Sequence, residues 1–167
     1  MADIFNYVPD DVSVLIAGLL TADGFVDGTF VNIDKDDMPY RSRTTADGRT
    51  SRLYRRSQTY TVSLTFHQGS IANDFLTKLW QLDEITGKAK FTMLVKDRSG
   101  SDLFFASTCW IEGVPSLVKS NGIDSKTWRI KCSFATINFG NNKEESTIVQ
   151  DLVNIATSSL PALNGII

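Results

Sequence analysis

Residues 58–66 read QTYTVSLTF, and from Tyr60 to Phe66 an apolar side chain stands at every second position. Serine or threonine fills the positions between, which is the period-two pattern of a strand with one buried face. Residues 126–136, KTWRIKCSFAT, repeat the pattern. The residues on the apolar parity of this second run are Trp128, Ile130, Cys132 and Phe134. Two such runs favour an antiparallel sheet that buries one face.

Weaker strand patterns flank these two runs. They lie over 12–20, 28–33, 89–95 and 103–111, separated by Asp-Gly, Ser-Gly and Gly-Val-Pro turn signals. Six or seven strands are typical of a β-sandwich or barrel. We therefore predict a mainly β (α+β) fold in which two packed antiparallel sheets form a sandwich or barrel.

One helical pattern interrupts the strands and is expected to flank the sheets. Ser70 is a suitable N-cap for this helix, Asp74 suits its first turn, and Gly87 is a suitable stop. The residues at helical spacing are Ile71, Phe75, Leu79 and Leu82, with Leu76 and Trp80 widening the stripe. Because the helix does not alternate with strands, a parallel βαβ layer is not expected.

The chain has 167 residues, which is close to the size of one domain, and 42% of them are hydrophobic. We expect a β domain over residues 1–140 and a C-terminal extension over 141–167. Within the extension, Ile148, Leu152 and Ile155 have helical spacing and predict an arm that contacts a neighbour. No apolar run is long enough for a membrane span and no basic leader opens the chain, so we expect a soluble, cytoplasmic protein without membrane partners.

Few residues are available for catalysis or metal binding. Cys109 and Cys132 form no CxxC motif, and His67 is the single histidine, so a zinc site is short of ligands. His67 follows the strand pattern directly, no GxSxG elbow is present, and we interpret it as a polar residue at a strand end. Both cysteines lie on apolar strand parities and are expected to be buried thiols. We predict no enzymatic activity, no cofactor and no metal site.

Residues 34–56 are unusual because they hold six of the eight arginines of the chain but few aliphatic residues. A long loop of this kind inside a compact domain is usually functional. Arginine and tyrosine are enriched at protein interfaces, which is our preferred interpretation, although the same residues suit phosphates and bases or a solvated hairpin. The expected interface residues are Tyr40, Arg41, Arg43, Arg49, Arg52, Tyr54, Arg55 and Arg56, together with Ile148, Leu152 and Ile155 of the extension.

Several short motifs resemble a family of structural proteins from contractile-tailed bacteriophages. They are DVSV at 11–14, GFVDGTFV at 24–31, ADG at 46–48, VKD at 95–97 and WIE at 110–112, followed by the strand with Trp128. The resemblance spans roughly residues 3 to 140 and implies a tail tube protein with two packed antiparallel sheets and a flanking helix, similar to the tube protein of type VI secretion systems. Such proteins form hexameric rings that stack into a tube through which DNA passes during ejection.

The resemblance also implies partners and a location. The partners would be further copies of the chain, the tail sheath protein, and baseplate and tail terminator proteins, with DNA passing through the lumen without specific binding. The protein would be part of the virion tail and would assemble in the cytoplasm of the bacterial host. Two alternatives stay open: a tail terminator or completion protein of related fold, and a nucleic-acid-binding module that uses the arginine-rich segment.

Overall fold

The computed structural model of the chain describes residues 7–140. In chain order its elements are η1 (Pro9–Asp11), β1 (Val12–Ile16), β2 (Leu20–Ala22), β3 (Val31–Lys35), β4 (Tyr40–Thr44), β5 (Thr50–Tyr54), β6 (Tyr60–His67), α1 (Ile71–Thr86), β7 (Phe91–Asp97), β8 (Leu103–Gly113) and β9 (Ser125–Asn138). Seven strands form one antiparallel sheet in the order β2-β1-β7-β8-β9-β6-β3, and β4 pairs only with β5.

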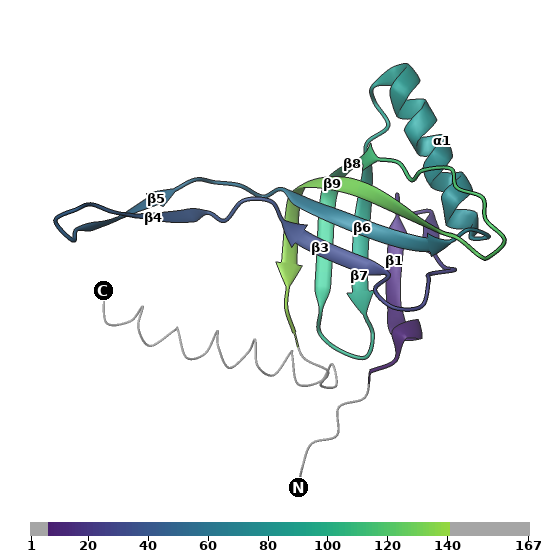
Figure 1. Cartoon of the computed structure of the whole chain (residues 1–167), viewed down its shortest axis with the longest axis horizontal. Helices are drawn as coiled ribbons and strands as arrows, with labels where there is room; N and C mark the ends of the chain where they lie inside the picture. Colours follow the sequence, from purple (N-terminus) through teal and green to yellow (C-terminus); the bar gives the residue numbers. More distant parts are fainter. Residues whose placement is uncertain (1–6, 141–167) are drawn as a thin grey trace, which may run out of the picture.

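The seven-stranded sheet bends on itself, so that β3 and β6 cross in front of β1 and β7 (Figure 1). Side chains from both halves belong to one core: Val14 of β1 and Leu64 of β6 are both fully buried in it. The predicted mainly β fold with antiparallel sheets and a flanking helix is confirmed. Its two layers are halves of one sheet, and the second hydrogen-bonded sheet is the β4–β5 pair.

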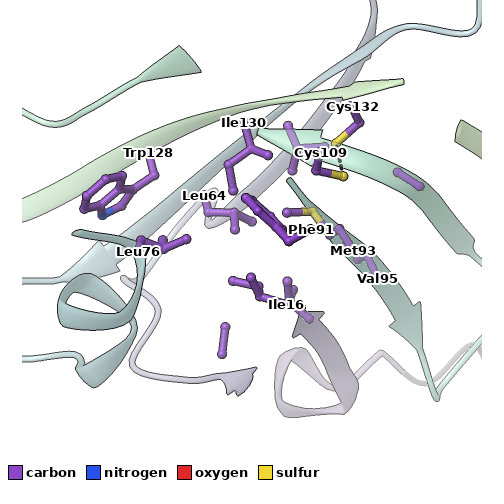
Figure 2. Packing of buried hydrophobic residues seen from close by; sticks show 14 of the residues in the cluster. Ile16, Leu64, Leu76, Phe91, Met93, Val95, Cys109, Trp128, Ile130 and Cys132 are labelled. Atoms are coloured by element: carbon purple, nitrogen blue, oxygen red, sulfur yellow. Dashed lines mark hydrogen bonds between the residues drawn. The ribbon is translucent and has the colours of Figure 1, made fainter. Parts of the chain in front are cut away.

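The core follows from the alternation in the two strongest strands. The burial pattern of β6 is strictly alternating, with Tyr60, Val62, Leu64 and Phe66 inside. Ile130 of β9 lies beside Leu64 and opposite Phe91 and Met93 of β7 (Figure 2). Burial of apolar area of this kind is the main stabilising term for a domain of this size.

The helix begins and ends where its capping residues predict. The Ser70 side chain accepts a hydrogen bond from the backbone N–H of Ala72 at 3.2 Å, and Gly87 adopts the left-handed conformation at the C-terminus. Most of the predicted stripe faces the core: Leu76 is fully buried, and Phe75, Leu79 and Trp80 pack against the core while partly buried. Ala72 and Asn73, which lie outside the predicted stripe, are also buried. Ile71 and Leu82, which were expected to be inside, are 70% and 51% exposed.

Two predicted strands differ from the structure. The pattern over 12–20 is a tight hairpin between β1 and β2, with Ala17 and Gly18 at positive φ. In β9, Phe134 has a φ of 51° and is 67% exposed, whereas the next residue, Ala135, is buried. The left-handed backbone at Phe134 interrupts the alternation of the strand, so Phe134 does not share the buried face of Trp128, Ile130 and Cys132.

Candidate assembly interface

The predicted loop over 34–56 is a β-hairpin that projects from the body of the molecule on the side away from α1 (Figure 1). We call residues 38–57, which contain β4 and β5, the ribbon. Every residue of both strands is exposed. An isolated two-stranded hairpin is only marginally stable in water, and exposed strand edges are usually covered in native proteins. These properties are typical of an element that contacts another molecule.

One face of the ribbon carries two tyrosines and an arginine, and we call it the tyrosine face. Tyr40 and Tyr54 are paired across the strands, with ring centroids 5.1 Å apart. The guanidinium of Arg52 lies 3.4 Å from the centroid of the Tyr40 ring. An exposed cation–π contact contributes roughly 0.5–1 kcal/mol, and an aromatic pair contributes a similar amount. The cluster therefore orders the side chains before any partner binds.

The opposite face of the ribbon carries Arg41, Arg43 and Leu53. Arg41 and Leu53 are paired across the strands, and Leu53 is 59% exposed. Arg41 forms an ion pair with Asp37 at 3.0 Å, and both side chains are more than a third exposed. An ion pair as exposed as this one contributes little to stability. Both faces of the ribbon therefore present guanidinium groups beside an apolar surface.

The tip of the ribbon is a short turn that depends on Gly48. The backbone N–H groups of Thr45 and Gly48 donate to Arg49 and Thr45, and Gly48 has a φ of 82°. This is a three-residue hairpin loop in which glycine takes the left-handed position. The hydroxyl of Thr45 donates to the Asp47 carboxylate, and this hydrogen bond, together with backbone N–H groups, lowers the pKa of Asp47.

The base of the ribbon is tied to the seven-stranded sheet by a polar cluster. Nζ of Lys131 lies 2.6 Å from Oδ2 of Asp36, and both side chains are 23% exposed. The Thr61 hydroxyl donates to Oδ1 of Asp36 at 2.6 Å. Partial burial raises the pKa of Asp36, but the hydrogen bonds from Lys131 and Thr61 outweigh it, so that the pKa lies below its ordinary value of 3.8. The hydrogen bond to Asp36 raises the pKa of Lys131.

A second contact anchors the segment that returns from β5 to β6. Nζ of Lys35, at the end of β3, donates to the backbone carbonyl of Ser57 at 3.1 Å and lies 4.8 Å from the centroid of the Tyr60 ring. The backbone N–H of Asp36 donates to the carbonyl of Thr59. Because both ends of the ribbon are fixed in this way, its direction is set by the body and not by the ribbon strands alone.

The charge of the chain is divided between the ribbon and the rest. Six arginines and one aspartate give residues 38–57 a formal charge of +5, whereas the whole chain carries −2, so the remaining residues carry −7. Opposite charges on two parts of one subunit favour contacts between copies in which unlike patches meet. The near-neutral composition of the whole chain conceals this separation.

The structure brings together most of the predicted interface residues. Six of the eight lie in β4, β5 or the turn between them, and Arg55 and Arg56 follow β5 as exposed residues. The backbone N–H of Arg55 donates to the Pro39 carbonyl at 2.7 Å, which closes the base of the hairpin. The predicted helical arm with Ile148, Leu152 and Ile155 lies outside the described residues.

The histidine and the two cysteines that were considered for catalysis or metal binding make local structural contacts. Nδ1 of His67, the last residue of β6, accepts a hydrogen bond from the backbone N–H of Gly69 at 3.2 Å. The sulfur atoms of Cys109 and Cys132 lie 3.1 Å apart, and both residues are fully buried (Figure 2). This contact and burial raise the pKa of the Cys132 thiol. The prediction of buried thiols is confirmed.

Residues 7–140 contain neither a cluster of metal ligands nor a membrane-spanning helix. In this range no three side chains of the His, Cys, Asp and Glu types gather closely enough to hold a metal ion. The single helix described is neither long nor apolar enough to cross a bilayer.

The sequence is similar to that of a phage structural protein. It is 26% identical over 164 residues to structural protein ORF10 of Pseudomonas phage KPP10, a match that covers 94% of this chain and 95% of that protein. No protein-family model matches the chain.

Two solved structures share the fold. The tube-terminating cap of the anti-feeding prophage matches 83% of this chain and 94% of its own, with a TM-score of 0.53 and 15% identity. The sheath/tube terminator of the PVC extracellular contractile injection system, in its extended state, matches 83% of this chain and 100% of its own, with a TM-score of 0.52 and 14% identity. At this level of identity the two matches establish a common fold.

Proposed function

We propose that this chain is a structural protein of a contractile phage tail and that it terminates the tail tube as a ring of identical subunits. The observation that carries the proposal is the pair of structural matches, which span 94% and 100% of two terminator chains. The similarity to a phage structural protein over nearly the whole of both chains supports the same conclusion.

We favour the role of tube terminator over that of tube protein for this chain. The resemblance in the sequence implies a tube protein, with the terminator as an alternative, and both structural neighbours carry the name of a terminator or terminating cap. We propose that six copies form the ring, that it contacts the sheath as well as the tube, and that DNA crosses its lumen without specific binding. The protein would act in the virion, after assembly in the host cytoplasm, and without catalysis.

The ribbon would form the contact between neighbouring subunits in the ring. Its exposed strands, tyrosine face and charge of +5 are of little use to a monomer but fit a protein interface. An isolated subunit that is ordered at the ribbon base by Asp36 and Lys131 can present the ribbon in a fixed direction. Such pre-organisation reduces the entropy that association must overcome.

The test is the assembly state of the full chain, measured by light scattering over a range of concentrations and by negative-stain electron microscopy. We expect single closed rings. Rings that stack into tubes of increasing length would support the tube protein instead, and a monomer at high concentration would overturn the ring proposal.

The role of the ribbon is tested by Arg52→Glu, Arg55→Glu and Arg56→Glu in one chain, which we call the ribbon variant. We expect it to lose rings while the far-UV circular dichroism stays unchanged. A matched control reverses three exposed lysines on or just after α1, Lys78, Lys88 and Lys90, so that the net charge is the same. If the control loses rings equally, net charge and not the ribbon controls assembly.

Nucleic-acid binding is the second candidate, favoured by the two exposed tyrosines and the six arginines of the ribbon. Binding through phosphates requires affinity to fall steeply with salt, because each neutralised phosphate releases a counterion. Fluorescence anisotropy with single- and double-stranded DNA at several salt concentrations tests this. Weak binding that is insensitive to salt would remove the candidate.

A further inference from the structure

A groove runs along the open end of the sandwich, between edge strand β3 and the strands of the other layer. Its first part has a volume of about 460 Å³, which is within the range of ligand-binding pockets. The apolar side chains that line it include Val12, Phe30, Val31, Ile33, Phe104 and Ile137, and we call this apolar lining the floor. They come from β1, β3, β8, β9 and the segment before β3.

A second hollow of about 510 Å³ adjoins the first, because Val12 and Phe30 line both. Phe25 and Val26 extend the apolar floor there. The Phe25 ring stacks on Phe66 of the core with centroids 4.9 Å apart, so this floor is fixed to the body. We call the two hollows together the acceptor groove.

The rim of the acceptor groove is acidic. Asp10, Asp23 and Asp27 line the second hollow, and all three are exposed. Asp97 and Asp102 line the first hollow, where Asp97 is buried and accepts hydrogen bonds from Ser99. Among the described residues no lysine, arginine or histidine lines either hollow. The three exposed aspartates of the second hollow form no ion pair within residues 7–140.

We propose that the acceptor groove receives the ribbon of a second copy of this chain. This inference rests on the proposed function, since it names the surface on which the ribbon docks. The ribbon carries the complementary chemistry: Tyr40 and Tyr54 for the apolar floor, and arginines for the acidic rim. A partner with both features in this arrangement is a copy of the same chain, and its ribbon charge of +5 meets a body whose described residues, 7–37 and 58–140, carry −6 and +2, or −4 together.

The occupant comes from another copy because the ribbon of the same chain projects away from its own body (Figure 1). A contact between ribbon and groove is heterologous, since two different surfaces of the subunit meet. When a heterologous contact is repeated, the subunits form a closed ring if the rotation between neighbours divides a full turn evenly. A ring-forming terminator requires this closure. Each subunit then contributes one ribbon and one groove.

The first test reverses the charge of the groove in one chain with Asp10→Lys, Asp23→Lys and Asp27→Lys, which we call the groove variant. We expect an apparent dissociation constant for ring formation at least roughly 100-fold above that of the wild type, since attraction is replaced by repulsion. A control that reverses Asp74, Glu84 and Glu112, three exposed acids outside the groove, has the same net charge and is expected to assemble. Circular dichroism and thermal melting identify misfolded variants.

Asp23 and Asp27 each precede a glycine in a turn, so lysine at these positions can disturb the backbone. A second groove variant, with asparagine at positions 10, 23 and 27, keeps the turn chemistry and removes only the charge. We expect it to weaken ring formation by roughly 10-fold and to reduce the dependence of assembly on salt. Assembly equal to wild type in this variant would count against the proposal.

The decisive test mixes the ribbon variant with the groove variant in equal amounts. Neither is expected to form rings alone. In the mixture, the acidic ribbon of one meets the basic groove of the other, and the wild-type ribbon meets the wild-type groove, so rings of alternating subunits should return. No recovery in the mixture, although the wild type forms rings, would overturn the groove as the docking site while leaving the proposed function intact. Absence of rings in the wild type would instead overturn the proposed function.

Discussion

Replacement of Asn73 by alanine should destabilise the fold, although this residue is a polar side chain on the helix. The indole N–H of Trp128 donates to Oδ1 of Asn73 at 3.0 Å, and Nδ2 of Asn73 donates to the His67 carbonyl at 3.0 Å. Asn73 is 5% exposed and Trp128 is 2% exposed. A single side chain therefore connects the helix to β9 and to the end of β6.

The magnitude follows from the hydrogen bonds that the variant removes. Asn73→Ala leaves the buried indole N–H of Trp128 without a partner, which costs about 1–3 kcal/mol. It also removes one of two hydrogen bonds to the His67 carbonyl, which still accepts from the backbone N–H of Ser70 at 3.0 Å, and a lost hydrogen bond of this kind costs about 0.5–1.5 kcal/mol. We expect the free energy of unfolding to fall by about 2–4 kcal/mol. At roughly 2–4 °C per kcal/mol for a chain of this size, the melting temperature should fall by roughly 5–15 °C.

Urea unfolding monitored by tryptophan fluorescence measures this change, and thermal melting provides a second value. Asn32→Ala is the matched control, because Asn32 donates to Asp34 at 2.8 Å on the exposed surface. We expect the control to change stability by less than about 0.5 kcal/mol. Trp128→Phe and the double variant complete a cycle, whose coupling energy should be about 1–2 kcal/mol.

A loss of less than about 1 kcal/mol in Asn73→Ala would refute the reasoning, because it would mean that water replaces the amide at no cost. A coupling energy near zero would show that Asn73 and Trp128 act independently. In that case, loss of packing and not the hydrogen bond would explain any destabilisation.

Further expectations concern charge, backbone conformation and thiol reactivity. Asp36→Asn should reduce stability by about 0.5–1 kcal/mol near neutral pH; because the folded-state pKa of Asp36 is lowered, the difference should vanish as pH falls below 3.8 in urea titrations. The pKa of Lys131 is raised, so its contribution should be lost only as pH rises above 10.5. Gly24→Ala should cost about 1–3 kcal/mol in urea unfolding, since the φ of Gly24 is 71° and a Cβ would lie 2.9 Å from the N-cap of α1. Iodoacetamide at pH 8 should leave Cys109 and Cys132 unmodified by mass spectrometry until denaturant is added, because both thiols are buried; rapid native labelling would contradict that burial.

Features encoded by neighbouring residues could be predicted from the sequence. The alternation from Tyr60 to Phe66 defines β6, and Ser70 and Gly87 define both ends of α1. These signals are local, because backbone geometry sets the period of a strand and capping hydrogen bonds reach only a few residues. The concentration of arginines and tyrosines in 34–56 was visible in the same way.

Features that depend on distant residues could not be predicted. Phe134 follows the apolar parity of β9, yet its positive φ, two residues beyond the last pair of β9 with β6, turns it to solvent. The pair of Asp36 and Lys131 joins the ribbon base to β9, and no spacing in the sequence indicates it. Whether 34–56 is a loop or a hairpin depended on a register that the polar strands specify only weakly.

The sequence by itself determined the type of fold, the limits of the strongest elements and the residues that the ribbon presents, because these depend on local periodicity, caps and composition. Only the tertiary structure decided which parts of the chain share one surface. Bending of one sheet into two layers brings the segments around Asp10, Asp23 and Asp27 to the rim of one groove and directs the ribbon away from it. Register and layer packing are set by side-chain contacts across the whole sheet, so a charge separation between two surfaces of the subunit becomes visible only after folding.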